Sequence, residues 1–299
     1  AVSSARRLES ERISRSKKLQ PRRFFGTHFD ETILMDVYWL EQTEADVPAG
    51  NHWLSRNEAI SLSGMRFAKR RADWRLGRWT AKLTAAARLN LSTDLHALTN
   101  IEICAASSGA PEVFVHGQPA GVAISLSHRD RTALCAVGPA GASLGCDLET
   151  IEARSDAFLA DYFTDNEKML VARAPVEARA LLLALLWSGK ESALKALHVG
   201  LRLDTRCLCV TPDDGWTSSP GEAPLDRPPV PGSTNPEGWC PLQVRYSGGR
   251  VFHGWWRSQD GFVRTAVSDP GMKSMLRTGV AVDGESGWTW VTCTTPALP

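Results

Sequence analysis

The 299-residue sequence lacks several features that mark particular classes of protein. No run approaches the ~18 consecutive apolar residues of a membrane-spanning helix, so we expect no membrane association. The formal net charge is only +1, which gives no global field for nucleic acid. The first 23 residues hold eight Lys or Arg and two Glu without an apolar core, which differs from a secretory signal. We expect residues 1–30 to form a flexible basic arm.

The seven cysteines include no Cys-x-x-Cys pair. Cys207 and Cys209 alternate along a predicted strand, but no matching His or Cys cluster lies near them in sequence. The cysteines therefore indicate buried thiols in a reducing cytoplasm and argue against zinc. With 43% hydrophobic and 22% charged residues, the chain has the composition of a soluble globular protein with a substantial core.

One candidate for chemistry is the stretch Ser-Leu-Gly-Cys-Asp-Leu-Glu at residues 143–149, which follows a Gly-Pro-Ala-Gly turn. Its alternation predicts a strand, with Asp147 and Glu149 on one face and Leu148 in the core. Taken alone, an Asp-x-Glu pattern is more typical of a solvated strand edge.

A second candidate follows the apolar run at residues 180–187, which is rich in helix formers. If the helix continues, Glu191 and Lys195 share a face. Taken alone, such a pair is typical of a surface ion pair worth about 0.3–0.5 kcal/mol. If the strand packs beside this helix, three carboxylates and an amine meet. That arrangement suits Mg²⁺ and leaves a cation for phosphate.

Together the two stretches resemble the motifs of the Sfp-type 4′-phosphopantetheinyl transferases. Residues 145–149 match the family's Gly-(Ile/Val/Cys)-Asp-x-Glu, and residues 187–195 match its Trp-x-x-Lys-Glu-(Ala/Ser)-x-x-Lys. The resemblance covers about residues 35–210. It implies Mg²⁺-dependent (or Mn²⁺-dependent) transfer of the 4′-phosphopantetheine arm of coenzyme A to a serine of an acyl or peptidyl carrier protein, with release of adenosine 3′,5′-bisphosphate.

The resemblance also implies roles for individual residues. Asp147, Glu149 and Glu191 are the expected metal ligands. Glu191 is the expected general base for the carrier serine. Lys195 is expected to stabilise the leaving phosphate, and Lys190 is a second-choice catalytic residue.

Coenzyme A contacts are expected from the most basic stretch, residues 66–82, which holds seven Lys or Arg. A solvated basic helix face is the alternative interpretation. The candidates are Lys69, Arg70 and Arg71, with Arg75 and Arg78 as second choices. The family implies further contacts from a turn and a strand end, which here contain Gly109, Pro111, Ser127 and His128. Ser108 and Ala110 replace basic residues that are common in this turn of the family.

Helix starts are indicated by two capping-box patterns, one at Ser55 and Glu58 and the other at Thr164 and Glu167. We expect the first helix to run on through Lys82. The runs at residues 243–246, 251–256 and 262–267 are typical of antiparallel strands.

The two halves of the chain resemble each other in sequence. Residues 38–44 resemble 146–152, and residues 77–83 resemble 189–195. In this match Trp39 stands where Asp147 does, and Trp79 where Glu191 does. Only the second copy keeps the carboxylates, so we expect one active site and a monomer.

We therefore predict an α+β fold built as a pseudo-twofold repeat, in which each half is an antiparallel-rich sheet packed against a long helix. The predicted divisions are the arm at 1–30, the N-terminal half at 31–140, the C-terminal half at 141–270 and a tail at 271–299. The aromatic residues of the tail are expected either to pack on the body or to pair as an extra strand. Two other functions compete with this interpretation. One is an inactive binding module for coenzyme A or carrier protein, and the other is a different Mg²⁺-dependent nucleotide enzyme, such as a nuclease.

Overall fold

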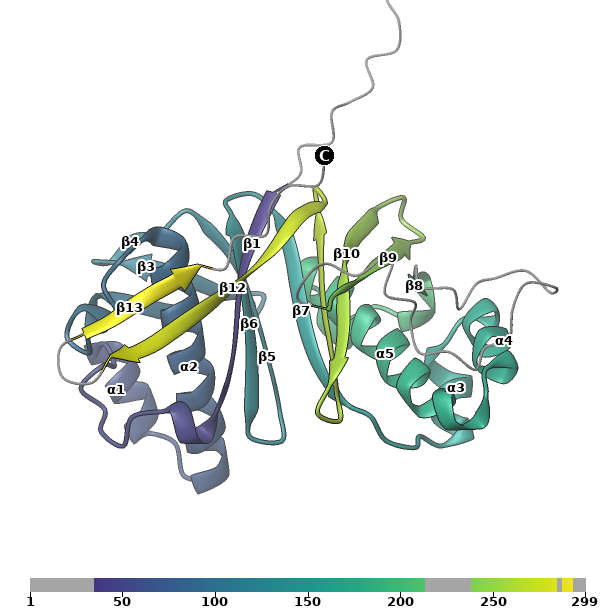
Figure 1. The fold of residues 1–299 in the computed structure, drawn as a ribbon, viewed down its shortest axis with the longest axis horizontal. Helices are drawn as coiled ribbons and strands as arrows, with labels where there is room; N and C mark the ends of the chain where they lie inside the picture. The colour runs from purple at the N-terminus through teal and green to yellow at the C-terminus, as the bar shows by residue number, and fades with distance from the viewer. Residues whose placement is uncertain (1–34, 213–237, 284–286, 293–299) are drawn as a thin grey trace, which may run out of the picture. The chain divides into compact units, whose positions relative to one another are not determined.

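The structure, a computed structural model, describes residues 35–212, 238–283 and 287–292, which belong to one compact unit, Thr32–Pro299. Within these residues the fold is mixed α+β, with five α-helices and three β-sheets (Figure 1). The predicted fold class is confirmed. The predicted basic arm lies outside the described residues. None of the described helices is long and apolar enough to cross a membrane.

The first sheet is built around the strand nearest the N-terminus. In spatial order its strands are β13 (Gly287–Thr292), β12 (Met272–Asp283), β1 (Met35–Thr43), β6 (Thr132–Pro139) and β5 (Val122–Arg129). β1 pairs antiparallel with β6 and parallel with β12. The predicted tail after residue 270 contributes two strands to this sheet, β12 beside β1 and β13 at the edge. Local sequence patterns do not reveal a pairing between opposite ends of a chain.

The second sheet is antiparallel throughout and carries the predicted carboxylate strand at one edge. In spatial order its strands are β7 (Ser143–Thr150), β11 (Phe262–Asp269), β10 (Val251–Gln259), β9 (Cys240–Tyr246) and β8 (Leu208–Pro212). The three antiparallel strands predicted from sequence are therefore confirmed. A small third sheet contains β2 (Ile101–Ala105), β3 (Pro111–Val115) and β4 (Gln118–Pro119).

Two of the five helices begin at the predicted capping boxes. The helices are α1 (Arg56–Ser63), α2 (Ala68–Leu89), α3 (Asp156–Tyr162), α4 (Asp165–Arg173) and α5 (Arg179–Ala196). Ser55 accepts the N–H of Glu58 at the start of α1, and Thr164 accepts the N–H of Glu167 at the start of α4. Each glutamate in turn accepts the backbone N–H of its capping residue.

The single helix that we predicted from Ser55 to Lys82 is in fact two helices. α1 ends at Gly64, which caps its last carbonyl groups. Phe67 then adopts an extended backbone before α2 begins. The hydrophobic and basic pattern alone does not show this break, because it runs through both helices.

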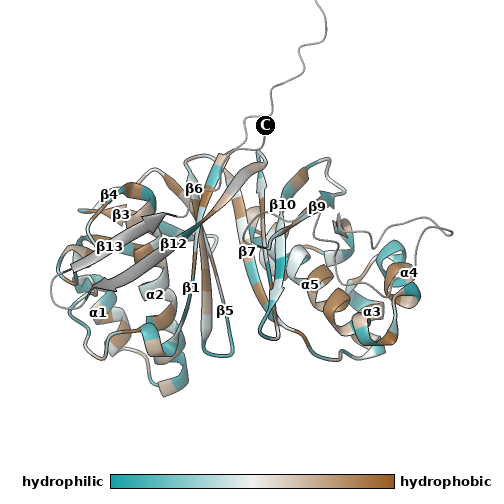
Figure 2. Cartoon of the chain, in the orientation of Figure 1, coloured by the Kyte–Doolittle hydropathy of each residue, from teal (hydrophilic) through white to brown (hydrophobic). Residues whose placement is uncertain are grey.

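The two large sheets pack face to face, and α2 and α5 cover their outer faces (Figure 1). The cluster between the sheets includes Trp39 and Ala136 from the first sheet and Cys146, Leu148 and Ala266 from the second. Figure 2 shows hydrophobic positions along these strands and on α5. The core thus fixes β7 with one face toward the first sheet and the other toward α5.

Helix α5 approaches β7 closely because the strand contains a glycine. A Cβ atom on Gly145 would lie 1.8 Å from the carbonyl oxygen of Ser192, so any larger residue would push the helix away. On the next strand, the Thr265 hydroxyl lies 2.8 Å from Ser188 Oγ and 2.7 Å from Ser192 Oγ. These contacts hold the polar end of α5 over β7.

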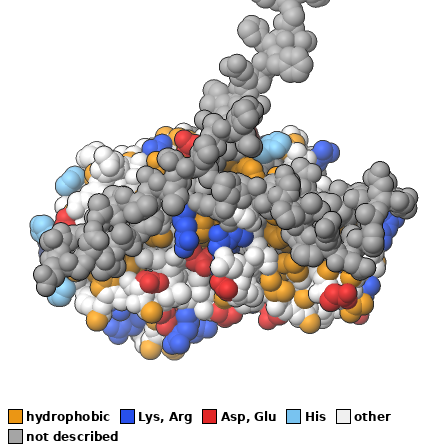
Figure 3. Space-filling model, in the orientation of Figure 1, with side chains coloured by type: hydrophobic (Ala, Val, Ile, Leu, Met, Phe, Trp, Pro, Cys, Tyr) orange, Lys and Arg blue, Asp and Glu red, His pale blue; other side chains and the backbone are white. Residues whose placement is uncertain are grey.

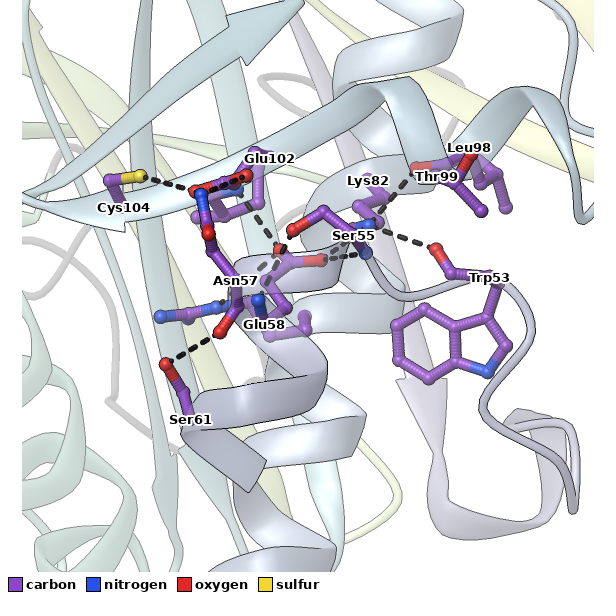
Figure 4. Close-up of polar contacts among 12 residues, drawn as sticks. Trp53, Ser55, Asn57, Glu58, Ser61, Lys82, Leu98, Thr99, Glu102 and Cys104 are labelled. Atoms are coloured by element: carbon purple, nitrogen blue, oxygen red, sulfur yellow. Dashed lines mark hydrogen bonds and ion pairs between the residues drawn. The ribbon is translucent and has the colours of Figure 1, made fainter. Parts of the chain in front are cut away.

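The first half contains a buried lysine that pairs with the glutamate of a capping box (Figure 4). Lys82 Nζ lies 2.5 Å from Glu58 Oε2 and donates to the carbonyl groups of Trp53 and Leu98. Glu58 Oε1 accepts the N–H of Ile103 from β2. The pair therefore joins α1, α2 and the small sheet.

The second half contains the same arrangement. Lys190 Nζ lies 2.8 Å from Glu167 Oε2 and donates to the carbonyl groups of Thr205 and Leu208. Glu167 Oε1 accepts the N–H of Val210 from β8. These matching contacts favour the repeat, which stays a prediction.

The matching lysines also change the register of the repeat. When Lys82 is matched with Lys190, Trp79 falls opposite Trp187 and Leu83 falls opposite Glu191. Our match through the glycines was therefore displaced by about one helical turn. In either register the first half has no carboxylate at the position of Glu191.

Candidate active site

The predicted carboxylates lie on the face of β7 that α5 covers. Asp147 and Glu149 are both buried, and Leu148 between them packs in the cluster between the sheets. The alternation predicted from sequence is thus present. From α5, Glu191 and Lys195 lie one turn apart, on the same helix face.

Asp147 joins three elements at the centre of the site. Its Oδ1 accepts a hydrogen bond from Lys195 Nζ on α5 at 2.7 Å, and one from Ser127 Oγ on β5 at 2.9 Å. Lys195 also donates to the carbonyl of Cys146 at 3.0 Å. Burial alone would lower the pKa of Lys195, but the combined attraction of Asp147, Cys146 and Glu191 outweighs it and the pKa is raised. The ammonium therefore stays charged.

Glu191 is the carboxylate whose proton affinity changes most. Burial raises the pKa of Glu191 to about 7, and the negative charges of Asp147 and Glu149 add to the increase against the attraction of Lys195. A carboxyl group with a pKa near neutrality can accept and return a proton near pH 7. The environment of Glu191 therefore suits the expected general base.

Glu149 lies within a network of arginines at the end of β7. Arg154 Nη2 lies 3.1 Å and Arg129 Nη1 lies 3.6 Å from Glu149 Oε2. Both arginines also pair with Glu152. Burial and the charge of Asp147 raise the pKa of Glu149, and the two arginines oppose that increase.

The expected metal ligands are Asp147, Glu149 and Glu191. Among the described residues, no group of three or more His, Cys, Asp or Glu side chains is arranged to hold a metal ion. Asp147 Oδ2, however, is buried and has no hydrogen-bond partner. A buried carboxylate oxygen without a partner is an oxygen donor available to a hard cation. The donors therefore fit a divalent cation, and the metal site stays a prediction.

The comparison with protein families matches the part of the chain that contains these residues. Residues 143–227 match the family model described as the 4′-phosphopantetheinyl transferase superfamily. This segment is similar to that superfamily. It includes β7, α5 and all four residues Asp147, Glu149, Glu191 and Lys195. No curated protein shows significant sequence similarity to the chain.

The match to the 4′-phosphopantetheinyl transferase superfamily supports a transferase that moves a phosphopantetheine group. Members of this superfamily use coenzyme A as substrate, typically with a divalent metal, and act on carrier-protein domains. The match spans less than a third of the chain, so the N-terminal half is interpreted from its geometry alone.

Lys190 does not lie among the carboxylates of the transferase segment. Its side chain is fully buried, and its ammonium group contacts Glu167 and the carbonyl groups of Thr205 and Leu208. An ammonium group has three donors, and these three partners satisfy them. The geometry therefore indicates a structural role for Lys190, in place of the catalytic role that we expected.

Some basic residues of α2 line a cavity and others do not. A cavity of about 480 Å³ is lined by Phe67, Lys69, Arg70, Asp73, Trp74, Gly77, Arg78, Leu126 and His128. Arg71 is exposed and does not line this cavity. Arg75 instead donates to the carbonyl groups of Pro48, Ala49 and Gly50. Of the second-choice residues, only Arg78 therefore faces the cavity.

A second cavity, of about 420 Å³, lies between the turn before β3 and the end of α5. Its lining includes Gly109, Pro111, Lys195, His198 and Arg202. Leu126 of β5 lines both cavities. The predicted turn residues and Lys195 therefore face one space, although Ser127 points to Asp147.

Sequence reasoning missed several charged residues of the site. Arg129 and Arg154 hold Glu149, and His198 and Arg202 line the second cavity. One signal was available for Arg129, which directly follows the Ser-His element. Figure 3 shows Lys and Arg side chains close to Asp and Glu side chains near the middle of the face drawn.

Proposed function

We propose that the protein is an Sfp-type transferase that moves the 4′-phosphopantetheine arm of coenzyme A to a serine of an acyl or peptidyl carrier protein, with Mg²⁺. The observation that carries this proposal is the convergence of Asp147, Glu191 and Lys195 beside the cavity that Gly109 and Pro111 line. Adenosine 3′,5′-bisphosphate is the second product.

The reaction exchanges a phosphoanhydride bond for a phosphodiester bond. The serine oxygen forms a bond to the phosphorus that carries pantetheine, and the bond from that phosphorus to the bridging oxygen of the pyrophosphate breaks. Glu191 takes the serine proton, and Lys195 stabilises the leaving phosphate. When bound, Mg²⁺ would be held by Asp147, Glu149 and Glu191 and would neutralise charge on the pyrophosphate.

Coenzyme A would extend across β5 between the two cavities. The cavity beside α2 offers Lys69, Arg70, Arg78 and His128 to phosphate groups. The cavity beside α5 offers Lys195, His198 and Arg202 together with apolar side chains such as Leu126 and Leu194. A ligand with both phosphate groups and an apolar body matches this pair of surfaces.

The carrier protein would dock on the second half. Three large apolar side chains are exposed there: Tyr162 at the end of α3, Met169 within α4 and Val176 between α4 and α5. Exposed apolar side chains gathered on neighbouring elements are typical of an interaction surface. We further propose that one chain acts as a monomer, because the second half supplies every proposed metal ligand.

The proposal is tested by following both products. An apo carrier protein, coenzyme A and Mg²⁺ should yield adenosine 3′,5′-bisphosphate, detected by chromatography, in proportion to the carrier supplied. A carrier whose acceptor serine is replaced by alanine should yield none. Equal nucleotide release with that variant would show hydrolysis rather than transfer, and would contradict the proposal.

A further inference from the structure

The two oxygens of Asp147 have different surroundings. Oδ1 accepts two hydrogen bonds, from Ser127 Oγ at 2.9 Å and from Lys195 Nζ at 2.7 Å. Oδ2 is buried and has no hydrogen-bond partner among the described residues. Because the side chain is only 4% exposed, water does not readily compensate this difference.

Ser127 reaches Asp147 across a junction between two edge strands. β5 ends the first sheet and β7 ends the second, and they do not pair through their backbones. Side chains on alternate residues of β5 bridge the gap. Ser125 Oγ accepts the N–H of Cys146 at 2.9 Å, and Ser127 Oγ then donates to Asp147. Of the two serines, only Ser127 bonds to the Asp147 carboxylate, whereas Ser125 bonds to the backbone of Cys146.

A serine hydroxyl carries one proton, and that of Ser127 is directed to Asp147 Oδ1. The side chain is 7% exposed, so it offers little surface to a ligand in either cavity. Leu126 lines both cavities and His128 lines one of them, but Ser127 lines neither. This placement differs from the coenzyme A contact that the family resemblance implies for Ser127.

We propose that Ser127 is a positioning residue for Asp147. With Lys195 it occupies Oδ1 and thereby presents Oδ2 to a divalent cation. This inference rests on the proposed metal-dependent transfer. Hydrogen bonds of this kind fix the orientation of metal ligands, and their loss typically lowers metal affinity about 10–100-fold.

Binding of Mn²⁺ alone, measured by electron paramagnetic resonance without substrates, tests this role. Ser127→Ala should weaken Mn²⁺ binding about 10-fold or more. Ser127→Thr keeps the hydroxyl and should stay within about threefold of the unsubstituted protein. Ser125→Ala is the matched control, because it removes a neighbouring buried hydroxyl that bonds to Cys146 rather than to Asp147. It should also leave Mn²⁺ affinity within about threefold.

Coenzyme A binding in excess EDTA, measured by calorimetry, separates this role from a phosphate contact. Ser127→Ala should bind coenzyme A as the unsubstituted protein does. A loss of coenzyme A affinity with unchanged Mn²⁺ binding would overturn the inference, as would equal losses of Mn²⁺ affinity in both serine variants. If Ser127→Ala does not fold, Ser127→Cys replaces it, with the same expected weakening of Mn²⁺ binding.

The outcomes also distinguish this inference from the proposed function. If the unsubstituted protein transfers phosphopantetheine and Ser127→Ala binds Mn²⁺ normally, only the inference fails. If the unsubstituted protein binds Mn²⁺ but transfers nothing, the proposed function fails, and the serine comparison still tests the positioning role. If it binds no Mn²⁺, the metal assignment and the inference fall together.

Discussion

Lys195 Nζ lies 2.7 Å from Asp147 Oδ1 and ties the last turns of α5 to β7. The contact joins the two sequence motifs in one site. It also raises the pKa of Lys195, against the effect of burial, so the residue presents a permanent positive charge beside the cavity that it lines. A permanent charge at this position suits a group that stabilises a leaving phosphate.

Replacing Lys195 should therefore affect turnover more than binding. We expect Lys195→Ala to lower kcat about 10²–10³-fold, with a much smaller change in the KM for coenzyme A. Lys168→Ala is the control, because Lys168 lies on α4 and its ammonium group pairs with Asp165 rather than with Asp147. Steady-state kinetics checks this prediction. A raised KM with an unchanged kcat would contradict the prediction, because Lys195 would then bind the substrate and the transition state equally.

Lys190 should behave in the opposite way. Lys190→Ala leaves the buried Glu167 carboxylate without its cation, so the free energy of unfolding should fall by about 3–5 kcal/mol. Lys82→Ala removes the equivalent contact with Glu58 in the first half, far in sequence from the carboxylates of the site. It should lower the free energy of unfolding by a similar amount. Urea unfolding measures both. Unchanged stability with lost activity in Lys190→Ala would restore its catalytic role.

The raised pKa of Glu191 predicts a dependence of stability on pH. In EDTA, the folded state holds the Glu191 proton more tightly than the unfolded state, whose pKa is near 4.5. The resulting stabilisation is complete below about pH 4.5 and is lost as the pH rises to about 7. Glu191→Gln should remove this contribution and show a shallower decline between these values. Urea unfolding at several pH values in this range checks the prediction. If the free energy of unfolding changed with pH in the same way for Glu191→Gln and the unsubstituted protein, the raised pKa would be contradicted.

The pair between buried Arg264 and half-buried Glu41 should hold the two sheets together. Arg264 on β11 is 3% exposed, and its Nη2 lies 2.6 Å from Glu41 Oε1 on β1. Arg264→Ala should lower the free energy of unfolding by about 3 kcal/mol, because Glu41 loses its partner. Arg131→Ala is the control, since Arg131 pairs with Glu44 at the exposed surface. A loss under about 1 kcal/mol in Arg264→Ala would indicate an ordinary surface pair.

Local patterns in the sequence predicted much of this fold. The capping boxes at Ser55 and Thr164 depend on residues three positions apart, and the alternation around Asp147 depends on neighbours. The parallel pairing of β1 with β12 depends on residues from opposite ends of the chain. For this reason the sequence alone left open whether the tail packs on the body or pairs as a strand, and gave no partner strand.

The same distinction applies to the site. The spacing of Glu191 and Lys195 predicted a shared helix face, because helix geometry is local. The ammonium group of Lys190 points to the carbonyl groups of Thr205, before β8, and of Leu208, at the start of β8. Only the tertiary fold places these two groups beside α5. The contact of Ser127 with Asp147 likewise depends on how two edge strands meet. Residue type and spacing carry no information about such a junction.

The most direct test of the central claim is the mass of an apo carrier protein after incubation with this protein, coenzyme A and Mg²⁺. Transfer should add ~340 Da, the mass of one phosphopantetheine arm, to the carrier serine. EDTA should abolish the gain, and Asp147→Ala should abolish it while the protein stays folded. An unchanged mass across acyl and peptidyl carriers, or a full gain with Asp147→Ala, would contradict the account.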